Sequence, residues 1–591
     1  MRLIYHRLVY RRFILVILLS LLPIASSLDP PFSAVVQRCE YWVAPPPEGN
    51  DRNPGTFDQP WATLEYASDH VLDNHCTIWF KDGVYTGENE VDQCFTTTTI
   101  LKTLNPYKAV LQNAGVVLNV NGACNTIFEG FVFRHTGTGS TELVVQTHRK
   151  DEQWAENIIF RDNIFHDSYN DDLLKIYNGV RLVTIENNVF YNQGESEQQV
   201  DVNSVTDVLI QDNIFFNDFE GSGRSNSKNT KHFIVIKDSN ENSDGLEGSK
   251  RVAVRRNIFL NWQGGRGETF LQVGNDGKPY HEAEDVQIEN NLLIGNTLNQ
   301  AWAAFGVNGG KNISFINNTV VGNLPSSAYA FHISLKGSNP KNENIYFYNN
   351  IWSDPTGTMG DDLTGGSNQF SRGDPDKVEN LVLDQNLYWN GDEEIPFGEL
   401  VSPLVDDMHR VIADPRLNTN HSDVMVPRWT GSAFQSGNTT IRQEFLRIVK
   451  QYAEIPTSSA AIGKANPNFA PADDILGHPR SATPDLGGYE YSLELTGNTH
   501  LTTAWLTWSG LHEPDAASQR ITYSDGITSH VVTSISVDKR SYQFTDLLAN
   551  STYTFTLTVH NNNDEVLARS NTLVLFTSGF RLFIPILLGF D

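Results

Sequence analysis

Lysine and carboxylate side chains recur at similar positions in three successive segments of the chain. This polar cluster consists of Asn170, Asp171, Asp172 and Lys175, then Asp201 and Asn203, then Lys237 and Asp238. Aspartate oxygens are ligands that Ca²⁺ prefers, and a lysine can accept a proton when its surroundings lower its pKa from about 10.4. Neighbouring carboxylates raise the pKa of a lysine unless a cation lies between them. The alternative interpretation is an ion-paired ladder on a solvated face.

The polar cluster lies on predicted strands that follow one another along the chain. Each segment alternates apolar and polar residues, so every second side chain faces outward. The segments are DLLKIYNG from Asp172, QQVDVNSV from Gln198, FIVIKDS from Phe233, FLQVGND from Phe270, AFGVNGG from Ala304 and FHISLKG from Phe331. Because neighbouring strands stack about 4.8 Å apart, Lys175 and Asp201 are predicted to lie side by side on one outer face.

A template repeated eight times defines the fold that carries these strands. Two apolar residues alternate with polar ones, an asparagine follows, and an apolar or aromatic residue comes two positions later, as in IIFRDNIFHDS from Ile158. The shared asparagines are Asn163, Asn188, Asn213, Asn257, Asn291, Asn318, Asn350 and Asn386. The smallest spacing between them is 25 residues, and larger spacings fit inserted loops. This pattern predicts an all-β protein built on a right-handed parallel β-helix.

The repeated positions have structural explanations. An asparagine at a coil corner tolerates left-handed dihedral angles and can bond to neighbouring backbone, so the asparagine ladder is interpreted as structural. The aromatic residues two places later are in phase with the apolar core and predict an internal stack. They are Phe165, Phe190, Phe215, Phe259, Trp352 and Tyr388.

Other polar residues are weaker candidates. In DSNENSDG, oxygen-bearing side chains alternate from Asp238 to Asp244, as in calcium loops, but the glycine is misplaced for an EF-hand, so a polar turn is favoured. Arg224, His232 and His332 are candidate substrate contacts, together with Asn203 from the polar cluster.

The N-terminal region predicts export. Four arginines and the apolar run Phe13–Leu22 precede small residues, which indicates a signal peptide over 1–27. The alternative is a retained membrane anchor. Four cysteines lie near the start of the mature chain and predict two disulfides of open connectivity, with free thiols as the alternative. They are Cys39, Cys76, Cys94 and Cys124.

The net charge of the chain limits the kinds of molecule that it can bind. The 591-residue chain has a formal charge of −27, which becomes −31 once the four arginines of the signal peptide are removed. Nucleic acid is therefore an unfavourable partner. An acidic polysaccharide would need a local basic patch or a bridging cation.

The sequence changes character after residue 491. Residues 492–577 contain alternating strands, and LLANSTYTFTLTV resembles the tyrosine-corner region of fibronectin type III domains, with Tyr553 at the corner. Residues 578–591 form an apolar tail whose length and Pro585 argue against a membrane span.

Four segments lie at the two ends of the predicted β-helix. At the start they are YWVAPPPEGNDRNPGTFDQPWATLEYA (Tyr41–Ala67) and TIWFKDGVYTG (Thr77–Gly87). At the end they are SSAAIGKA (Ser458–Ala465) and DLGGYEY (Asp485–Tyr491). These segments resemble secreted β-helix proteins related to family 9 polysaccharide lyases, which are pectate-lyase-like. The resemblance covers roughly residues 40–491, and the predicted β-helix domain spans residues 28–491, with its N-terminal part held by the predicted disulfides.

The resemblance also implies a chemistry. In that family a lysine removes the proton next to a uronate carboxylate, calcium held by aspartates neutralises that carboxylate, and β-elimination breaks the glycosidic bond. Carried over, Lys175 is the first candidate base and Lys237 the second. The candidate calcium ligands are Asp171, Asp172, Asp201 and Asp238.

The leading hypothesis is a secreted or cell-surface, monomeric, calcium-assisted polysaccharide lyase. A non-catalytic polysaccharide-binding or adhesion protein is the first alternative. A glycoside hydrolase is the second, and it would need paired acids, for which Asp171 or Asp172 with Asp201 could serve.

Overall fold

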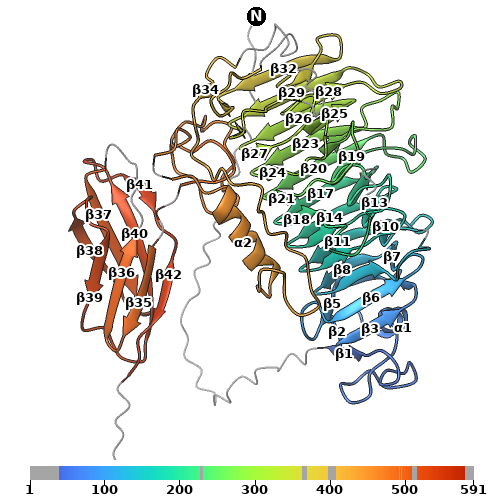
Figure 1. The fold of residues 1–591 in the computed structure, drawn as a ribbon. Helices are drawn as coiled ribbons and strands as arrows, with labels where there is room; N and C mark the ends of the chain where they lie inside the picture. The colour runs from blue at the N-terminus through green and yellow to red at the C-terminus, as the bar shows by residue number, and fades with distance from the viewer. Residues whose placement is uncertain are drawn as a thin grey trace, which may run out of the picture. The chain divides into compact units, whose positions relative to one another are not determined.

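Alternating apolar side chains and corner asparagines fold the middle of the chain into stacked coils (Figure 1). The computed structural model describes residues 39–140, 142–225, 230–361, 369–396, 407–456, 458–491, 493, 495–508 and 516–579. The predicted signal peptide and residues 580–591 of the apolar tail lie outside these ranges. Within them, no helix is long and apolar enough to cross a membrane.

Each complete coil contributes one strand to each of three parallel sheets, so the chain forms a parallel β-helix. The β1 sheet contains β1 (Glu40–Val43), β2 (Thr77–Phe80), β5 (Cys94–Thr103), β8 (Cys124–Glu129), β11 (Glu156–Arg161), β14 (Arg181–Glu186), β17 (Thr206–Gln211), β20 (Ser249–Arg255), β23 (Ala283–Glu289), β26 (Gly310–Ile316), β29 (Asn342–Tyr348) and β32 (Val378–Asp384). The β3 sheet contains β3 (Gly83–Thr86), β6 (Ala109–Asn113), β9 (Val132–His135), β12 (Ile164–His166), β15 (Val189–Tyr191), β18 (Ile214–Phe216), β21 (Ile258–Phe259), β24 (Leu292–Asn296), β27 (Thr319–Asn323), β30 (Ile351–Ser353), β33 (Leu387–Trp389) and β34 (Val411–Ile412).

The third sheet, called the ten-stranded sheet below, carries the polar cluster. It contains β4 (Asn89–Val91), β7 (Leu118–Asn121), β10 (Val145–His148), β13 (Leu174–Tyr177), β16 (Val200–Asn203), β19 (Ile234–Lys237), β22 (Thr269–Val273), β25 (Ala303–Asn308), β28 (Phe331–Ser334) and β31 (Arg372–Gly373). All six alternating segments identified in the sequence fall on equivalent strands of this sheet. The eightfold template supplies the other two strands of each coil, joined at the asparagine.

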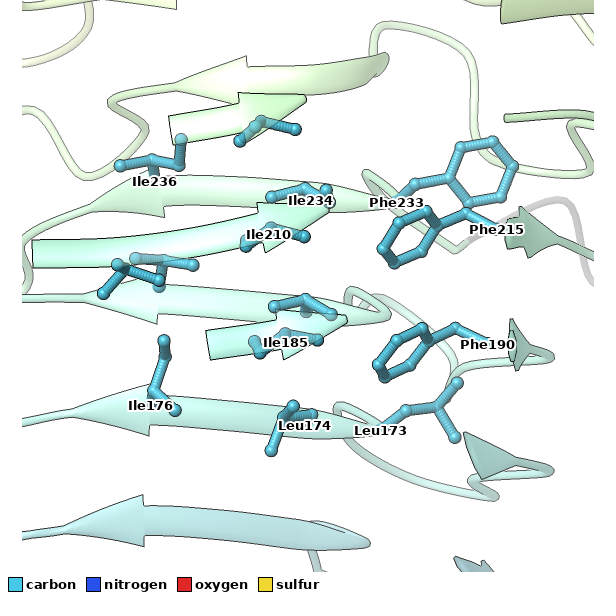
Figure 2. Close-up of a cluster of buried hydrophobic side chains, with 14 of the residues drawn as sticks. Leu173, Leu174, Ile176, Ile185, Phe190, Ile210, Phe215, Phe233, Ile234 and Ile236 are labelled. Atoms are coloured by element: carbon cyan, nitrogen blue, oxygen red, sulfur yellow. The ribbon is translucent and has the colours of Figure 1, made fainter. Parts of the chain in front are cut away.

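Inward-facing side chains form continuous columns through the coils (Figure 2). Phe165, Phe190, Phe215 and Phe259 stack in register with ring centroids 4.6 to 5.0 Å apart. This confirms the predicted internal aromatic stack. Offset stacking of buried rings stabilises each step beyond the burial of apolar surface.

The asparagine ladder is also confirmed, but its geometry differs from the prediction. The side-chain oxygen of Asn213 accepts hydrogen bonds from the backbone N–H (2.9 Å) and side chain (3.0 Å) of Asn188. Asn213 in turn donates to Asn257 at 3.0 Å. The left-handed conformation belongs to the preceding residue, such as Asp212 with φ of 59°. This division leaves the ladder asparagine free to point inward and bond from coil to coil.

The N-terminal end is held by two disulfides, Cys39–Cys76 and Cys94–Cys124, which settles the connectivity that the sequence left open. The helix α1 (Leu64–His70) begins at the N-cap Thr63 and buries Leu64 and Ala67 in the same core as the coils. Disulfides persist in oxidising compartments, so this end is compatible with an extracellular location.

The coils end at β34, and the chain then returns along the outer side of the β3 sheet. The helix α2 (Ile441–Tyr452) packs Phe445 and Ile448 into a second core with outward residues of that sheet, including Phe216. The returning chain also bonds to the corners: Gly487 donates to the Asn349 carbonyl at 2.8 Å. Residues 413–456 and 458–491 of the predicted β-helix domain therefore form a covering segment, which adds no coil.

The C-terminal module is an antiparallel β-sandwich. One sheet contains β35 (Leu495–His500), β36 (Thr503–Trp508) and β39 (Ser541–Phe544). The other contains β37 (Ser518–Ser524), β38 (Ser529–Ile535), β40 (Thr552–His560), β41 (Val566–Arg569) and β42 (Leu573–Phe576). The hydroxyl of Tyr553 accepts a hydrogen bond from the Leu548 backbone at 2.9 Å, as expected for a tyrosine corner.

Candidate functional site

The candidate site lies on the outer face of the ten-stranded sheet and in the loops that lead into its strands. Lys175 on β13 is the register partner of Asp201 on β16, which places the two side by side as the sequence predicts. Tyr177 is likewise opposite Asn203, and Asn203 is opposite Lys237. Lys237 therefore occupies a neighbouring column, while Val235 lies opposite Asp201.

Three carboxylates gather beside Lys175. One oxygen from each of Asp171, Asp172 and Glu197 lies within 4.8 Å of the others. Asp171 and Asp172 lie in the loop before β13, and Glu197 occupies the equivalent loop before β16. Among the residues that the structure describes, this is the one group of His, Cys, Asp or Glu with metal-ligand spacing. We call it the carboxylate cluster.

Asp172 is the most constrained member of the carboxylate cluster. Its side chain is fully buried, and its Oδ1 accepts a 2.8 Å hydrogen bond from the Gln198 backbone. Its Oδ2 receives no hydrogen bond from the described residues, and Lys175 Nζ is 3.8 Å away. Burial, and then the charge of Asp201, raise the pKa of Asp172 well above its usual range.

Glu197 is in a similar electrostatic position. Burial, and then the charge of Asp171, raise the pKa of this carboxyl. Crowded carboxylates with raised pKa values are incompletely compensated by the cations around them. Such a set of oxygens fits a Ca²⁺ ion, which takes carboxylate ligands and supplies the missing positive charge.

Asp201 joins the two candidate lysines. Its Oδ2 lies 3.0 Å from Lys175 Nζ and 3.7 Å from Lys237 Nζ, and the side chain is 1% exposed. Burial alone would lower the pKa of Lys175, but Asp201 and Asp172 outweigh burial and raise it. Lys237 shows the same balance, with Asp201 and Asp276 as the carboxylates that raise its pKa. The ion-paired ladder is therefore present around both lysines.

The sequence interpretation assigned Asp201 and Asp238 to a metal with Asp171 and Asp172. Within the described residues, the carboxylate cluster includes neither of them. Asp201 is turned toward the lysines. The two oxygens of Asp238 accept backbone hydrogen bonds from Asn240 (2.9 Å) and Gly248 (2.7 Å), which is the polar turn that the sequence favours.

Arg224 and His232 lie in the loop between β18 and β19, His332 lies on β28, and all three are engaged with other residues. Arg224 donates to the Asn192 carbonyl at 3.0 Å and covers the Tyr169 ring. His232 Nε2 lies 3.1 Å from Glu268. His332 is separated from Lys175 by five strand steps, or about 24 Å at the usual strand spacing. His332 therefore does not converge on one point with Lys175.

Two participants were missed by sequence reasoning. Glu197 follows Asp171 by 26 residues, the same spacing that separates Lys175 from Asp201, so the repeat itself holds the signal that identifies it. Asp276 lies 3.4 Å from Lys237 Nζ and comes from an inserted loop after β22, where no template copy fixes the register.

Neither protein-family models nor curated proteins match the chain. Among solved structures, PfbA, a surface adhesin of Streptococcus pneumoniae, is similar at 12% identity over 48% of this chain and 86% of that chain, with a TM-score of 0.32. The A-module of the mannuronan C-5 epimerase AlgE6 of Azotobacter vinelandii is similar at 13% identity over 57% and 91%, with a TM-score of 0.32. An fn3 domain of human contactin 1 is similar at 15% identity over 16% and 82%, with a TM-score of 0.15.

Proposed function

We propose that this chain is an extracellular, calcium-assisted lyase that cleaves a uronate-containing polysaccharide at the outer face of the ten-stranded sheet. The observation that carries the proposal is the carboxylate cluster of Asp171, Asp172 and Glu197 directly beside Lys175. A chain of charge −27 repels an acidic polymer unless a bound cation bridges them.

The carboxylate cluster would hold the cation. When bound there, calcium would neutralise the carboxylate of a uronate unit and offset the charge of Asp172 beside Lys175. The chain contributes three carboxylate oxygens from two adjacent loops. The buried Asp172 Oδ2 receives no hydrogen bond from the described residues, so it is suited to bind a calcium ion.

Lys175 would act as the base. Its amine takes the proton from the carbon next to the uronate carboxylate, and the resulting electron pair forms a carbon–carbon double bond. The glycosidic carbon–oxygen bond breaks, and the leaving oxygen takes a proton from solvent. Because Asp201 and Asp172 raise the pKa of Lys175, we expect activity to increase toward alkaline pH, where more of the amine is unprotonated.

The test uses the ultraviolet absorbance of the unsaturated product. The full chain is incubated with pectate, alginate or a glycosaminoglycan, with calcium or with a chelator. We expect absorbance that requires calcium, disappears in Lys175→Ala and persists in Lys250→Ala. Lys250 is a matched control because it is ion-paired on the β1 sheet with its side chain 32% exposed. Absorbance that survives Lys175→Ala would contradict the assignment of the base.

Non-catalytic binding of the same polymers is the second candidate. It is favoured by the pairing of both lysines with Asp201, which keeps them protonated. Calcium-dependent binding without absorbance or new reducing ends would support this function. New reducing ends without absorbance would indicate a hydrolase.

A further inference from the structure

Trp302 is a large aromatic residue that lies outside the buried core. It lies in the loop between β24 and β25, immediately before the first residue of β25, and it is 39% exposed. Its ring packs against the imidazole of His332, with ring centroids 4.4 Å apart. A large aromatic surface on a polar face offers a platform to the apolar face of a sugar ring.

The backbone around Trp302 is fixed to both neighbouring coils. Its N–H donates to the Glu268 carbonyl at 2.7 Å, and its carbonyl accepts from the Ala328 N–H at 2.9 Å. Ala301 pairs with Ser326 in an isolated parallel bridge. A side chain presented by a fixed backbone loses little conformational entropy when a ligand packs on it.

Positive charge accompanies the ring. Arg372 is the register partner of His332 on β31, and its side chain is 43% exposed. The neighbouring Asp374 lies 2.9 Å from Lys377 but 3.7 Å from Arg372, so its main ion pair is with Lys377. Two cations share one carboxylate here, which leaves a local excess of positive charge. Burial, followed by the charge of Arg372, lowers the pKa of His332 to about 4, so the imidazole is neutral at physiological pH.

This site continues the face that carries the carboxylate cluster. Lys175, Asp201, Val235, Gln272, Gly306 and His332 occupy successive positions of one outward column. The column runs across the strands, along the axis of the β-helix, and five strand steps span about 24 Å. A polymer lying along this column would pass both places, whereas a short oligomer would reach one.

We infer that Trp302, His332 and Arg372 form a second sugar-binding site, which takes a uronate unit of the same polymer at a distance from the carboxylate cluster. The inference rests on the proposed function for its ligand. The sugar ring packs on the indole, and its carboxylate pairs with the Arg372 guanidinium. The site therefore selects for long acidic chains over short ones.

The test compares chain lengths in a protein that cannot cleave. In the full-length Lys175→Ala background, calorimetry measures calcium-dependent binding of trimers and of long oligomers of galacturonate and mannuronate. We expect Trp302→Ala to weaken binding of the long oligomers about fivefold to tenfold and to leave trimer binding unchanged. Trp302→Phe should retain most of the affinity, which separates loss of the platform from misfolding.

Trp505→Ala is the matched control, because Trp505 is 40% exposed but lies on the β-sandwich. Equal affinity of the parent and Trp302→Ala for long oligomers would overturn this inference and leave the proposed function standing. Failure of the parent to bind any of the oligomers in calcium would overturn both.

Discussion

Lys175 and Asp201 face each other across neighbouring strands, with Nζ 3.0 Å from Oδ2. The same carboxylate oxygen lies 3.7 Å from Lys237 Nζ, so one buried anion serves two cations from different coils. Lys237 also reaches Asp276 at 3.4 Å. The result is a chain of alternating charges across four successive coils, in which Asp201 is the anion shared by both lysines.

Asp201→Asn should destabilise the fold, because it keeps the side-chain shape but leaves two largely buried lysines without their shared anion. We expect the free energy of unfolding to fall by about 3 kcal/mol, as measured by chemical denaturation. Asp207→Asn is the control: Asp207 pairs with Arg251 on the surface, with side chains 36% and 54% exposed. Its loss should cost less than about 1 kcal/mol. Equal losses of unfolding free energy in the two variants would show that the buried charge of Asp201 contributes no more to stability than a surface ion pair does.

Calcium should stabilise the protein through the carboxylate cluster. At a concentration 100-fold above the dissociation constant, a ligand specific for the folded state adds about 2.7 kcal/mol. The thermal midpoint should therefore rise with calcium in the parent and much less in Glu197→Gln. Magnesium is a useful comparison, because it binds through few protein carboxylates and retains its waters.

Without calcium, the parent should lose its advantage in thermal midpoint over Glu197→Gln. Burial and Asp171 raise the pKa of Glu197, so the folded protein holds this proton more tightly than the unfolded chain. The charged carboxylate then destabilises the fold increasingly as pH rises through its folded-state pKa. In a chelator at neutral pH, Glu197→Gln should match or exceed the parent in thermal midpoint. A lower midpoint in the chelator would contradict the repulsion inferred for the cluster.

Asn213→Ala should strongly destabilise the β-helix. Asn213 is fully buried and bonds to Asn188 and Asn257 in the ladder and to the Ile185 carbonyl at 2.8 Å. Its loss leaves several buried polar groups unpaired, at about 1–3 kcal/mol for each group.

Gln211→Ala is the control for the ladder. Gln211 lies two residues earlier in the same coil, donates to Glu186 at 2.9 Å, and accepts from Arg255 at 3.0 Å and Arg256 at 2.9 Å on the outer face of the β1 sheet. Water can replace these bonds on the partly exposed face, so the cost should stay near about 1 kcal/mol. Chemical denaturation gives the free energy of unfolding of each variant. Comparison of the two values shows whether the burial or the number of the lost hydrogen bonds governs the stability of the β-helix.

The fold was predictable because its determinants repeat. Phe190 and Asn188 recur at one coil spacing, and stacking identical residues satisfies the same packing and hydrogen-bond needs in each coil. Lys175 and Asp201 could be paired for the same reason. Inserted loops have no such constraint, so the contact of Asp276 with Lys237 depends on a loop conformation that alternation does not determine.

The covering segment explains another difference between expectation and structure. Segments near Asp485 resemble those that end β-helices, and they indicated coils up to Tyr491. In the structure the coils end at β34, and this segment bonds to corner asparagines such as Asn317, whose Nδ2 donates to the Asp485 carbonyl at 2.9 Å. Local motifs do not distinguish a final coil from a strap across earlier coils, because both place polar backbone beside the same corners.

His421 in the covering segment should make the protein sensitive to acid. The side chain is 6% exposed and packs 5.7 Å from the Tyr452 ring, measured between centroids. Burial lowers its pKa from 6.5 to about 4, so the unfolded chain takes up a proton at pH values where the folded protein does not. Stability contributed by neutral His421 is therefore complete above pH 6.5 and is lost as pH falls toward about 4, by up to about 3 kcal/mol.

The measurement is the free energy of unfolding at several pH values between 4 and 7, compared between the parent and His421→Phe. The variant should show a shallower decline in acid, because it removes one proton taken up on unfolding. His530→Phe is the control, since His530 is exposed on β38 and solvated in both states. Other titrating groups contribute equally to all three proteins, so the difference between curves isolates His421. Parallel curves for the parent and His421→Phe would mean that the buried imidazole titrates alike in both states, and the covering segment would then not be a source of acid sensitivity.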